Sequence, residues 1–185
     1  QNLPVGARIL EIGGGTDCRV LRAIARDYEC WNLDRFDDKP QGARFTDAHT
    51  GVCLVNDHLG ARNANLPDAT FDFAFSVSVF EDVCEKDTFR NKRDDLSRIL
   101  RPGAHVLHIS SATLHETHSA SPAFFKWLQC QKKTLYPLPP MEDLTKDSDL
   151  FCLSENTYNR LWLPYTGIAF SEFGRPISLN ALCTN

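Results

Sequence analysis

Three consecutive glycines follow a short apolar segment near the start of the chain. Gly13, Gly14 and Gly15 come directly after Glu11 and Ile12, and Asp34 stands nineteen residues after Gly15, at the end of the next apolar run. Glycines let the backbone approach a ligand closely, and an acidic side chain at a neighbouring strand end can accept hydrogen bonds from both hydroxyls of a ribose. The pattern predicts a nucleoside-binding site.

A dinucleotide site would follow the same logic but would require a third glycine. The G-x-G-x-x-G fingerprint, counted from Gly13 and Gly15, needs glycine at position 18, where this chain has Cys18. The chain also lacks a recognisable Tyr-x-x-x-Lys pair. A nicotinamide-dependent oxidoreductase is therefore the weaker of the two enzyme interpretations.

The elements that position these residues follow from apolar periodicity and turn signals. Strands are expected at Ala7–Ile12, Cys30–Leu33, Phe71–Val79 and His105–Ser110, whereas Val52–Leu54 is compatible with a strand or a helix. Helices are expected at Cys18–Ala25 and Lys86–Leu100, the second ending at Arg101-Pro102-Gly103, and residues 37–51 resemble a loop. Strands alternating with helices require parallel pairing through crossovers. The predicted fold class is α/β, a doubly wound, mostly parallel seven-stranded sheet with helices on both faces.

The pattern changes beyond Ser111. A helix is expected near residues 122–133, followed by a proline-rich stretch and a polar segment through Ser148 that form a candidate lid. A helix at Ser154–Leu163 then leads to strands at Ile168–Phe173 and Ile177–Cys183, which predict a C-terminal antiparallel hairpin. We find no repeat or linker, so residues 1–185 are expected to form a single domain.

Three motifs follow one another along the chain. The first is the acidic residue and glycine run at residues 11–17. The second is the Asn63-Ala64 pair followed by Leu66-Pro67 and Phe71-Asp72, and the third is Leu100-Arg101-Pro102-Gly103. In this order they resemble the motifs of the class I S-adenosylmethionine-dependent methyltransferases, in particular the methyltransferase type 11-like members. Compared with that family, Asp17 replaces a common third glycine and Ala104 replaces a second glycine.

The resemblance implies S-adenosylmethionine as the cofactor. Glu11 and the glycine backbone would surround its amino acid part, and Asp34 would bind its ribose, with Arg35 next to it. Asn63, which stands where the family usually has Asp, and the Ala64 backbone would lie near the adenine. The Ser76 backbone would lie near the methionine ammonium.

A general base would help if the acceptor were a hydroxyl group. His115, Glu81 and Asp82 are the candidate catalytic residues, with His108 and His118 as further histidines near strand ends. Glu81 and Asp82 could instead simply begin a helix, because acidic side chains favour the first helical turn. His115 and His118 lack a further ligand at a recognisable metal spacing, so no metal site is expected.

Composition narrows the class of protein. The formal net charge of -4 and the pI near 5.8 disfavour binding to a polyphosphate backbone, so no nucleic acid partner is expected. The longest apolar stretch is too short for a membrane span. Seven cysteines without a C-x-x-C pair indicate reduced thiols and hence a cytoplasmic location.

The working hypothesis is methyl transfer to a small-molecule or sugar-containing acceptor, giving S-adenosylhomocysteine. The segment Tyr28–Asp34, taken with the glycine run, resembles bacterial methyltransferases of polysaccharide or glycan pathways. A methyltransferase-like binding module without turnover is the non-enzyme alternative, motivated by Asn63 and Asp82. The oligomeric state is left open.

Overall fold

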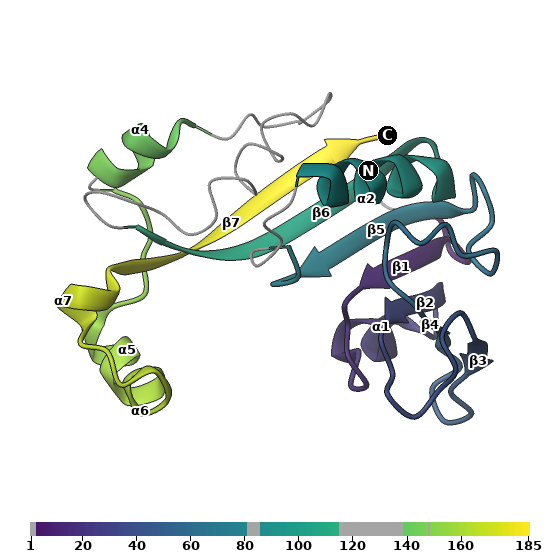
Figure 1. The fold of residues 1–185 in the computed structure, drawn as a ribbon, viewed down its shortest axis with the longest axis horizontal. Helices are drawn as coiled ribbons and strands as arrows, with labels where there is room; N and C mark the ends of the chain where they lie inside the picture. The colour runs from purple at the N-terminus through teal and green to yellow at the C-terminus, as the bar shows by residue number, and fades with distance from the viewer. Residues whose placement is uncertain (1–2, 81–85, 115–138, 148) are drawn as a thin grey trace.

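The computed structural model describes residues 3–80, 86–114, 139–147 and 149–185, and its centre is one seven-stranded sheet (Figure 1). The strand order is β3-β4-β2-β1-β5-β6-β7. The strands are β1 (Arg8–Ile12), β2 (Glu29–Asp34), β3 (Arg44–Thr46), β4 (Cys53–Asn56), β5 (Phe71–Val77), β6 (Leu100–Leu114) and β7 (Arg175–Thr184). The helices are α1 (Arg19–Ile24), α2 (Lys86–Ile99), α4 (Met141–Lys146), α5 (Glu155–Leu161), α6 (Leu163–Thr166) and α7 (Phe170–Phe173).

The centre of the sheet is parallel and both edges are antiparallel. β1 pairs in parallel with β2 and β5, β2 with β4, and β5 with β6. The chain moves outward from β1 through β2 to β4 and then returns to the other side of β1 as β5. Such a reversal leaves a crevice at the carboxyl ends of the strands, where open α/β sheets bind ligands. The predicted fold class is confirmed.

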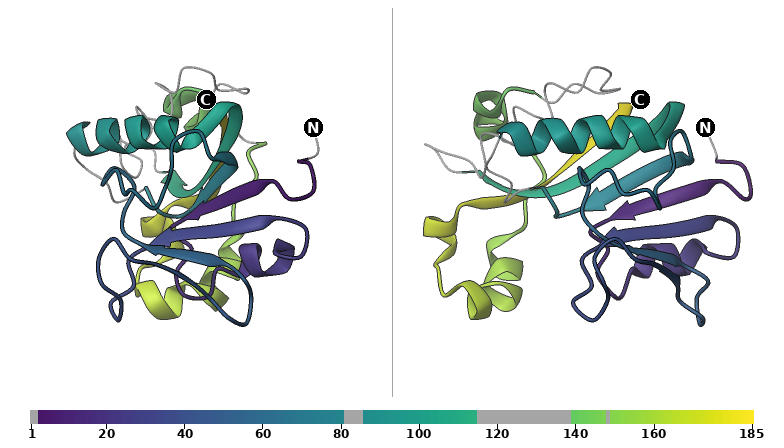
Figure 2. Two further views of the ribbon diagram at one scale, coloured as in Figure 1. Left: turned by 90° about the vertical axis from the view of Figure 1, so that its right-hand side faces the viewer. Right: turned by 45° about the vertical axis from the view of Figure 1, so that its right-hand side comes forward.

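The two faces of the sheet carry separate apolar cores, because side chains alternate along each strand. Leu21 of α1 packs with Ile9, Cys30 and Phe75 on one face. On the other face, Phe89, Leu96 and Ile99 of α2 pack in a cluster that includes Leu10 and Leu33. Figure 2 shows α1 and α2 on opposite sides of the sheet.

The structure differs from the sequence expectation at the first edge. Residues 37–51, expected to be a loop, contain β3, which pairs antiparallel with β4 and places Phe45 opposite Leu54. Phe45 also packs edge-on against Phe36, with ring centroids 5.6 Å apart. The uncertain segment at Val52–Leu54 is a strand, since β4 begins at Cys53.

The expected strand at Ile168–Phe173 is wrong. These residues instead contain α7, where Phe170 and Phe173 pack on the fully buried ring of Tyr158 from α5, with centroids 5.4 and 4.9 Å from it. The antiparallel partner of β7 is therefore β6, from His105 opposite Thr184 to Leu114 opposite Arg175. A C-terminal antiparallel pair exists, but its first strand is β6.

The segment expected to form a lid contains a short helix. In α4, Leu144 is buried against Ala112, Leu114, Ile177 and Leu179 at the far end of the β6 and β7 pair. The helix expected near residues 122–133 lies outside the described residues.

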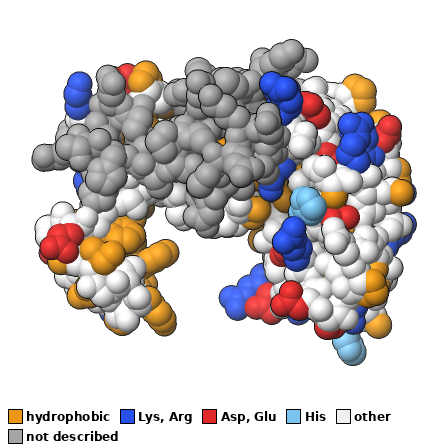
Figure 3. Space-filling view, viewed as in Figure 1, with side chains coloured by type: hydrophobic (Ala, Val, Ile, Leu, Met, Phe, Trp, Pro, Cys, Tyr) orange, Lys and Arg blue, Asp and Glu red, His pale blue; other side chains and the backbone are white. Residues whose placement is uncertain are grey.

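The predicted helix after Ser154 is present as α5, and the Ser154 hydroxyl accepts a hydrogen bond from the Thr157 N–H at its start. Helices α5 to α7 form a small unit at the same far end, and Figure 3 shows hydrophobic side chains gathered on it. Within the described ranges, no helix is long and apolar enough to cross a membrane.

Candidate active site

In the glycine turn after β1, close contacts at Gly13 and Gly14 leave no room for side chains. Gly13 has φ +75, and a Cβ atom there would lie 2.5 Å from Cγ2 of Val79. A Cβ atom on Gly14 would lie 2.6 Å from the carboxylate carbon of Glu11 and 2.9 Å from Oδ1 of Asn32. At Gly14 the backbone therefore packs directly against the Glu11 carboxylate. Glycine was expected in this turn because it allows such a close approach of the backbone.

Asn32 holds this turn, although the sequence interpretation did not single it out. Its side-chain carbonyl accepts a hydrogen bond from the Gly14 N–H (3.1 Å), and its amide donates to the Gly15 carbonyl (2.7 Å). Asn32 is fully buried on β2. A polar residue inside the apolar run Cys30–Leu33 was the signal, because a buried amide must find hydrogen-bond partners.

Asp34 and the glycine turn come together as the spacing suggested. Oδ2 of Asp34 accepts a hydrogen bond from the Gly15 N–H (2.6 Å), and Oδ1 accepts one from the Arg35 N–H (2.7 Å). The Asp34 side chain is partly exposed, and that of Arg35 is exposed. Each carboxylate oxygen keeps a lone pair for a further donor.

Glu11 is the most unusual group in the site. Its side chain is only 6% exposed, and among the described residues its Oε2 has no hydrogen-bond partner. Burial, followed by the negative charge of Asp34, raises the pKa of the Glu11 carboxyl group. Because a buried carboxylate without a partner is costly, this oxygen marks a place for a donor or a cation.

The next strand end along the sheet supplies a carboxylate that the sequence interpretation missed. Asp57 follows β4 and is buried, and its Oδ2 accepts a hydrogen bond from the Asn63 amide (2.9 Å). The Asn63 carbonyl accepts one from the Asn65 N–H (2.7 Å), so both ends of this amide have partners within the protein, while Ala64 beside it is exposed. The signal in the sequence was an acidic residue directly after β4, which the sequence interpretation left open between a strand and a helix at Val52–Leu54.

A polar pocket of about 280 Å³ opens between the end of β4 and the segment after β2. Its lining begins at Arg35, the residue directly after Asp34 in the sequence, and includes Asp57. Its lining residues are Arg35, Phe36, Asp37, Lys39, Gln41, Asn56 and Asp57.

Ser76 and His108 lie side by side on β5 and β6. The Ser76 hydroxyl and Nδ1 of His108 are 2.8 Å apart, and both side chains are about 1% exposed. The edge of the Phe80 ring packs against His108 at 5.2 Å between centroids. Burial lowers the pKa of His108 to about 3, so its imidazole is neutral near pH 7 and a poor proton acceptor.

The three catalytic candidates, His115, Glu81 and Asp82, lie outside the described residues, as does His118. Across the part of the chain that the structure describes, no group of three or more His, Cys, Asp or Glu side chains could hold a metal ion.

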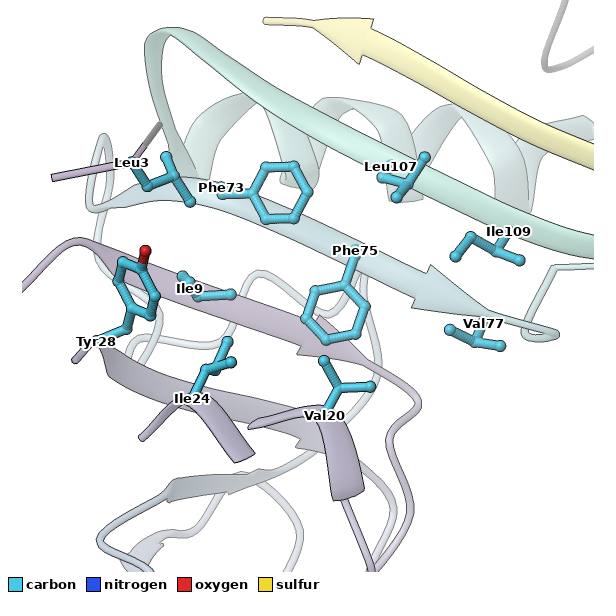
Figure 4. Close-up of a pocket in the computed structure, with 10 residues that line it drawn as sticks. All are labelled: Leu3, Ile9, Val20, Ile24, Tyr28, Phe73, Phe75, Val77, Leu107 and Ile109. Atoms are coloured by element: carbon cyan, nitrogen blue, oxygen red, sulfur yellow. The ribbon is translucent and has the colours of Figure 1, made fainter. Parts of the chain in front are cut away.

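A larger hollow, lined entirely by described residues, lies elsewhere. A cavity of about 470 Å³ runs along the α1 face of β1, β5 and β6, and Figure 4 shows its side chains converging from both sheet and helix. Its lining residues are Leu3, Ile9, Val20, Ile24, Tyr28, Phe73, Phe75, Val77, Leu107 and Ile109. Apart from the Tyr28 hydroxyl, this lining offers no polar side chain.

No protein-family model matches the sequence. An uncharacterized protein of Mycobacterium tuberculosis, found in two strains, is 30% identical over 140 residues, which are 70% of this chain and 45% of that protein. The chain thus spans about half the length of the curated relatives it matches.

Solved structures resemble the whole chain. The Haemonchus contortus phosphoethanolamine N-methyltransferase 2 in complex with S-adenosyl-L-methionine has a TM-score of 0.54 at 15% identity, covering 100% of this chain and 50% of that one. A putative sarcosine dimethylglycine methyltransferase from Galdieria sulphuraria has a TM-score of 0.55 at 11% identity, covering 98% of this chain and 79% of that one. The architecture of this chain is therefore that of the class I S-adenosylmethionine-dependent methyltransferases.

Proposed function

We propose that the carboxyl ends of β1, β2 and β4 bind S-adenosylmethionine and that the protein transfers its methyl group to an acceptor, releasing S-adenosylhomocysteine. The observation that carries this proposal is the Glu11 carboxylate, buried against the bare backbone of Gly14 with one oxygen lacking a partner among the described residues. A ligand with an ammonium group and a ribose fits these residues.

Different residues are assigned to different parts of the cofactor. Glu11 faces the amino acid part, where an ammonium group would relieve its unpaired charge. The backbone of Gly13, Gly14 and Gly15 lies close to this part, while the N–H groups of all three donate to acceptors within the protein. Asp34 uses its remaining lone pairs for the ribose hydroxyls, with Arg35 at the rim.

For the adenine we propose a revised assignment. Asp57, rather than Asn63, accepts the hydrogen bond from the adenine amino group. The Asp57 carboxylate accepts from the His58 N–H and the Asn63 amide and still keeps a lone pair on each oxygen, whereas the single side-chain oxygen of Asn63 is already an acceptor for the Asn65 N–H. Asn63 then orients Asp57, and the exposed Ala64 backbone stays near the ring. The polar pocket walled by Phe36 and Asp57 supports this placement, since it offers both an apolar surface and an acceptor.

The bound cofactor supplies a methyl carbon already activated by its sulfonium, so the protein chiefly has to align the acceptor with it. Ser76 lies near the carboxyl end of β5, the strand beside β1, and its backbone is proposed to approach the ammonium group. His115, Glu81 and Asp82 remain the candidates for a general base. The buried His108 is not one, because its low pKa keeps it unprotonated and its Nδ1 is held by Ser76.

The acceptor is proposed to be a small molecule or a glycan-related metabolite rather than nucleic acid, since the net charge of -4 disfavours a polyphosphate. Residues 1–185 are proposed to act as one domain. The described cysteines are free, and four of them, Cys18, Cys30, Cys53 and Cys183, are buried, which supports a proposed location in the cytoplasm.

Calorimetric titration with S-adenosylmethionine, S-adenosylhomocysteine and NADH tests the cofactor class. We expect micromolar binding of the first two and none of NADH. Preference for NADH, or no binding of any of the three, would overturn the proposal. Binding without methyl transfer to any of a panel of small-molecule and glycan acceptors would instead favour a binding module without turnover.

A further inference from the structure

The loop between β4 and β5 is fastened to α2 by one buried carboxylate. Oδ2 of Asp95 accepts hydrogen bonds from the N–H groups of Gly60 (2.8 Å) and Arg62 (3.1 Å). Asp95 is only 1% exposed. These two backbone hydrogen bonds to one buried carboxylate oxygen fix the position of the loop segment that supplies the donors.

Arg98 completes this fastening one helical turn later. Its Nε and Nη2 atoms donate to Oδ1 of Asp95 at 3.0 and 2.8 Å, and its Nη1 donates to the Leu66 carbonyl at 2.7 Å. The backbone carbonyl of Arg98 also accepts the Ala69 N–H at 2.8 Å. Asp95 and Arg98 therefore hold both the tip and the end of the loop.

The fastened tip lies between the two residues assigned to the adenine end of the site. Gly60 and Arg62 fall between Asp57 and Asn63, whose side chains are joined by the 2.9 Å hydrogen bond. Arg62 has φ +53, a left-handed conformation that a non-glycine residue adopts only when its surroundings impose it. The Asp95 bonds at Gly60 and Arg62 supply that constraint.

We infer that Asp95 and Arg98 are positioning residues that set the selectivity of the site for adenine, by holding the loop in the conformation that aims Asp57. This inference rests on the proposed function and adds to it residues of α2 that lie outside the cofactor site. Releasing the tip lets Asp57 and Asn63 move together, so the acceptor for the adenine amino group is no longer fixed.

A pair of ligands separates positioning from general stability. S-inosylhomocysteine carries an oxygen where S-adenosylhomocysteine carries the amino group. The dissociation constant of S-inosylhomocysteine divided by that of S-adenosylhomocysteine, called the ratio below, therefore reports on the Asp57 acceptor. A substitution that only lowers stability leaves this ratio unchanged in protein that is still folded. Asp95→Asn should reduce the ratio about tenfold, because an amide at this position turns one NH2 group toward existing donors.

The titrations use the whole chain, well below the unfolding temperature of each variant. Asp94→Asn is the matched control, because Asp94 is the exposed neighbour on α2 and pairs only with Arg93 within the described residues. Arg98→Gln is the second variant, since it keeps the Asp95 carboxylate and should fold if Asp95→Asn does not. It should reduce the ratio by a smaller factor, and amide hydrogen exchange at Gly60 and Arg62 should accelerate in both variants.

The outcomes are distinct. A ratio that falls in Asp95→Asn or Arg98→Gln and holds in Asp94→Asn supports the inference. An unchanged ratio in the folded variants, with faster exchange at Gly60, overturns it while the proposed function stands. Absence of S-adenosylhomocysteine binding by the wild-type protein overturns the proposed function itself, and the inference with it.

Discussion

Two hollows lined by described residues differ in size, chemistry and place. The polar pocket at the strand ends has about 280 Å³, and the apolar cavity on the α1 face of the sheet has about 470 Å³. The lining of the smaller one includes Asp57 and Arg35, the residue after Asp34, and hydrogen bonds within the protein fix both carboxylates. The larger one is lined by aliphatic and aromatic side chains. Since a charged ligand needs polar groups held in fixed positions, the smaller hollow is the better match to the proposed cofactor despite its lower volume.

The largest effect that separates the two regions is on stability. Phe75 lies in the wall of the apolar cavity and is 5% exposed within the core under α1. Phe75→Ala should lower the free energy of unfolding by about 3 to 5 kcal/mol, since it removes most of a buried aromatic side chain. Urea denaturation measures this change.

The same variant tests whether the cavity takes part in cofactor binding. In conditions where Phe75→Ala is fully folded, its affinity for S-adenosylhomocysteine should equal that of the wild type. A clear loss of affinity in folded protein would make the apolar cavity part of the cofactor site.

The next effect is on binding. Asp34→Ala should weaken S-adenosylhomocysteine by about 1.5 to 3 kcal/mol, because it removes the charged acceptor of the ribose hydroxyls. Titration calorimetry measures the loss, and Asp27→Ala, at an exposed aspartate that lines neither hollow, is the control. Equal affinities of Asp34→Ala and wild type would remove Asp34 from the site.

A smaller effect should depend on pH. Because burial and Asp34 raise the pKa of Glu11 above 4.5, folding is helped by its protonation, and that help is lost as the pH rises through the raised pKa. Glu11→Gln should therefore gain stability relative to wild type as the pH rises from about 4 to about 7, while it binds S-adenosylhomocysteine more weakly. Denaturation at both pH values checks the sign, and a stability difference that does not change with pH would show that Glu11 is not strained by burial.

The smallest effect is expected at the rim of the apolar cavity. Val77 is 42% exposed at the carboxyl end of β5. Val77→Ser should change the free energy of unfolding by less than about 0.5 kcal/mol and leave S-adenosylhomocysteine affinity unchanged. Weakened binding in this variant would extend the site toward the cavity.

Sequence reasoning was strongest where local pattern and tertiary structure agree. The turn between β1 and α1 and its meeting with Asp34 follow from glycine chemistry and from parallel pairing, both of which can be read locally. It was weaker where a single tertiary contact decides the outcome. Phe170 and Phe173 have strand-like neighbours, but they form α7 because they pack on Tyr158.

The edge strand β3 and the side-chain partners inside the site could not be predicted from the sequence either. β3 is three residues long and pairs only at one edge, so it gave no alternation to detect. Asp57 could be recognised as the strand-end carboxylate only once β4 was placed beside β2, and Asn63 could be assigned to it only once their side chains were seen to pair.

The central claim is that the polar carboxyl edge, and not the larger apolar cavity, holds the cofactor. Amide hydrogen exchange with and without S-adenosylhomocysteine tests it most directly. We predict new protection at Gly13, Gly14, Gly15, Arg35 and the loop after Asp57, with little change at Ile24, Phe73 and Leu107. Protection concentrated on the cavity residues, with the glycine turn unchanged, would contradict the account.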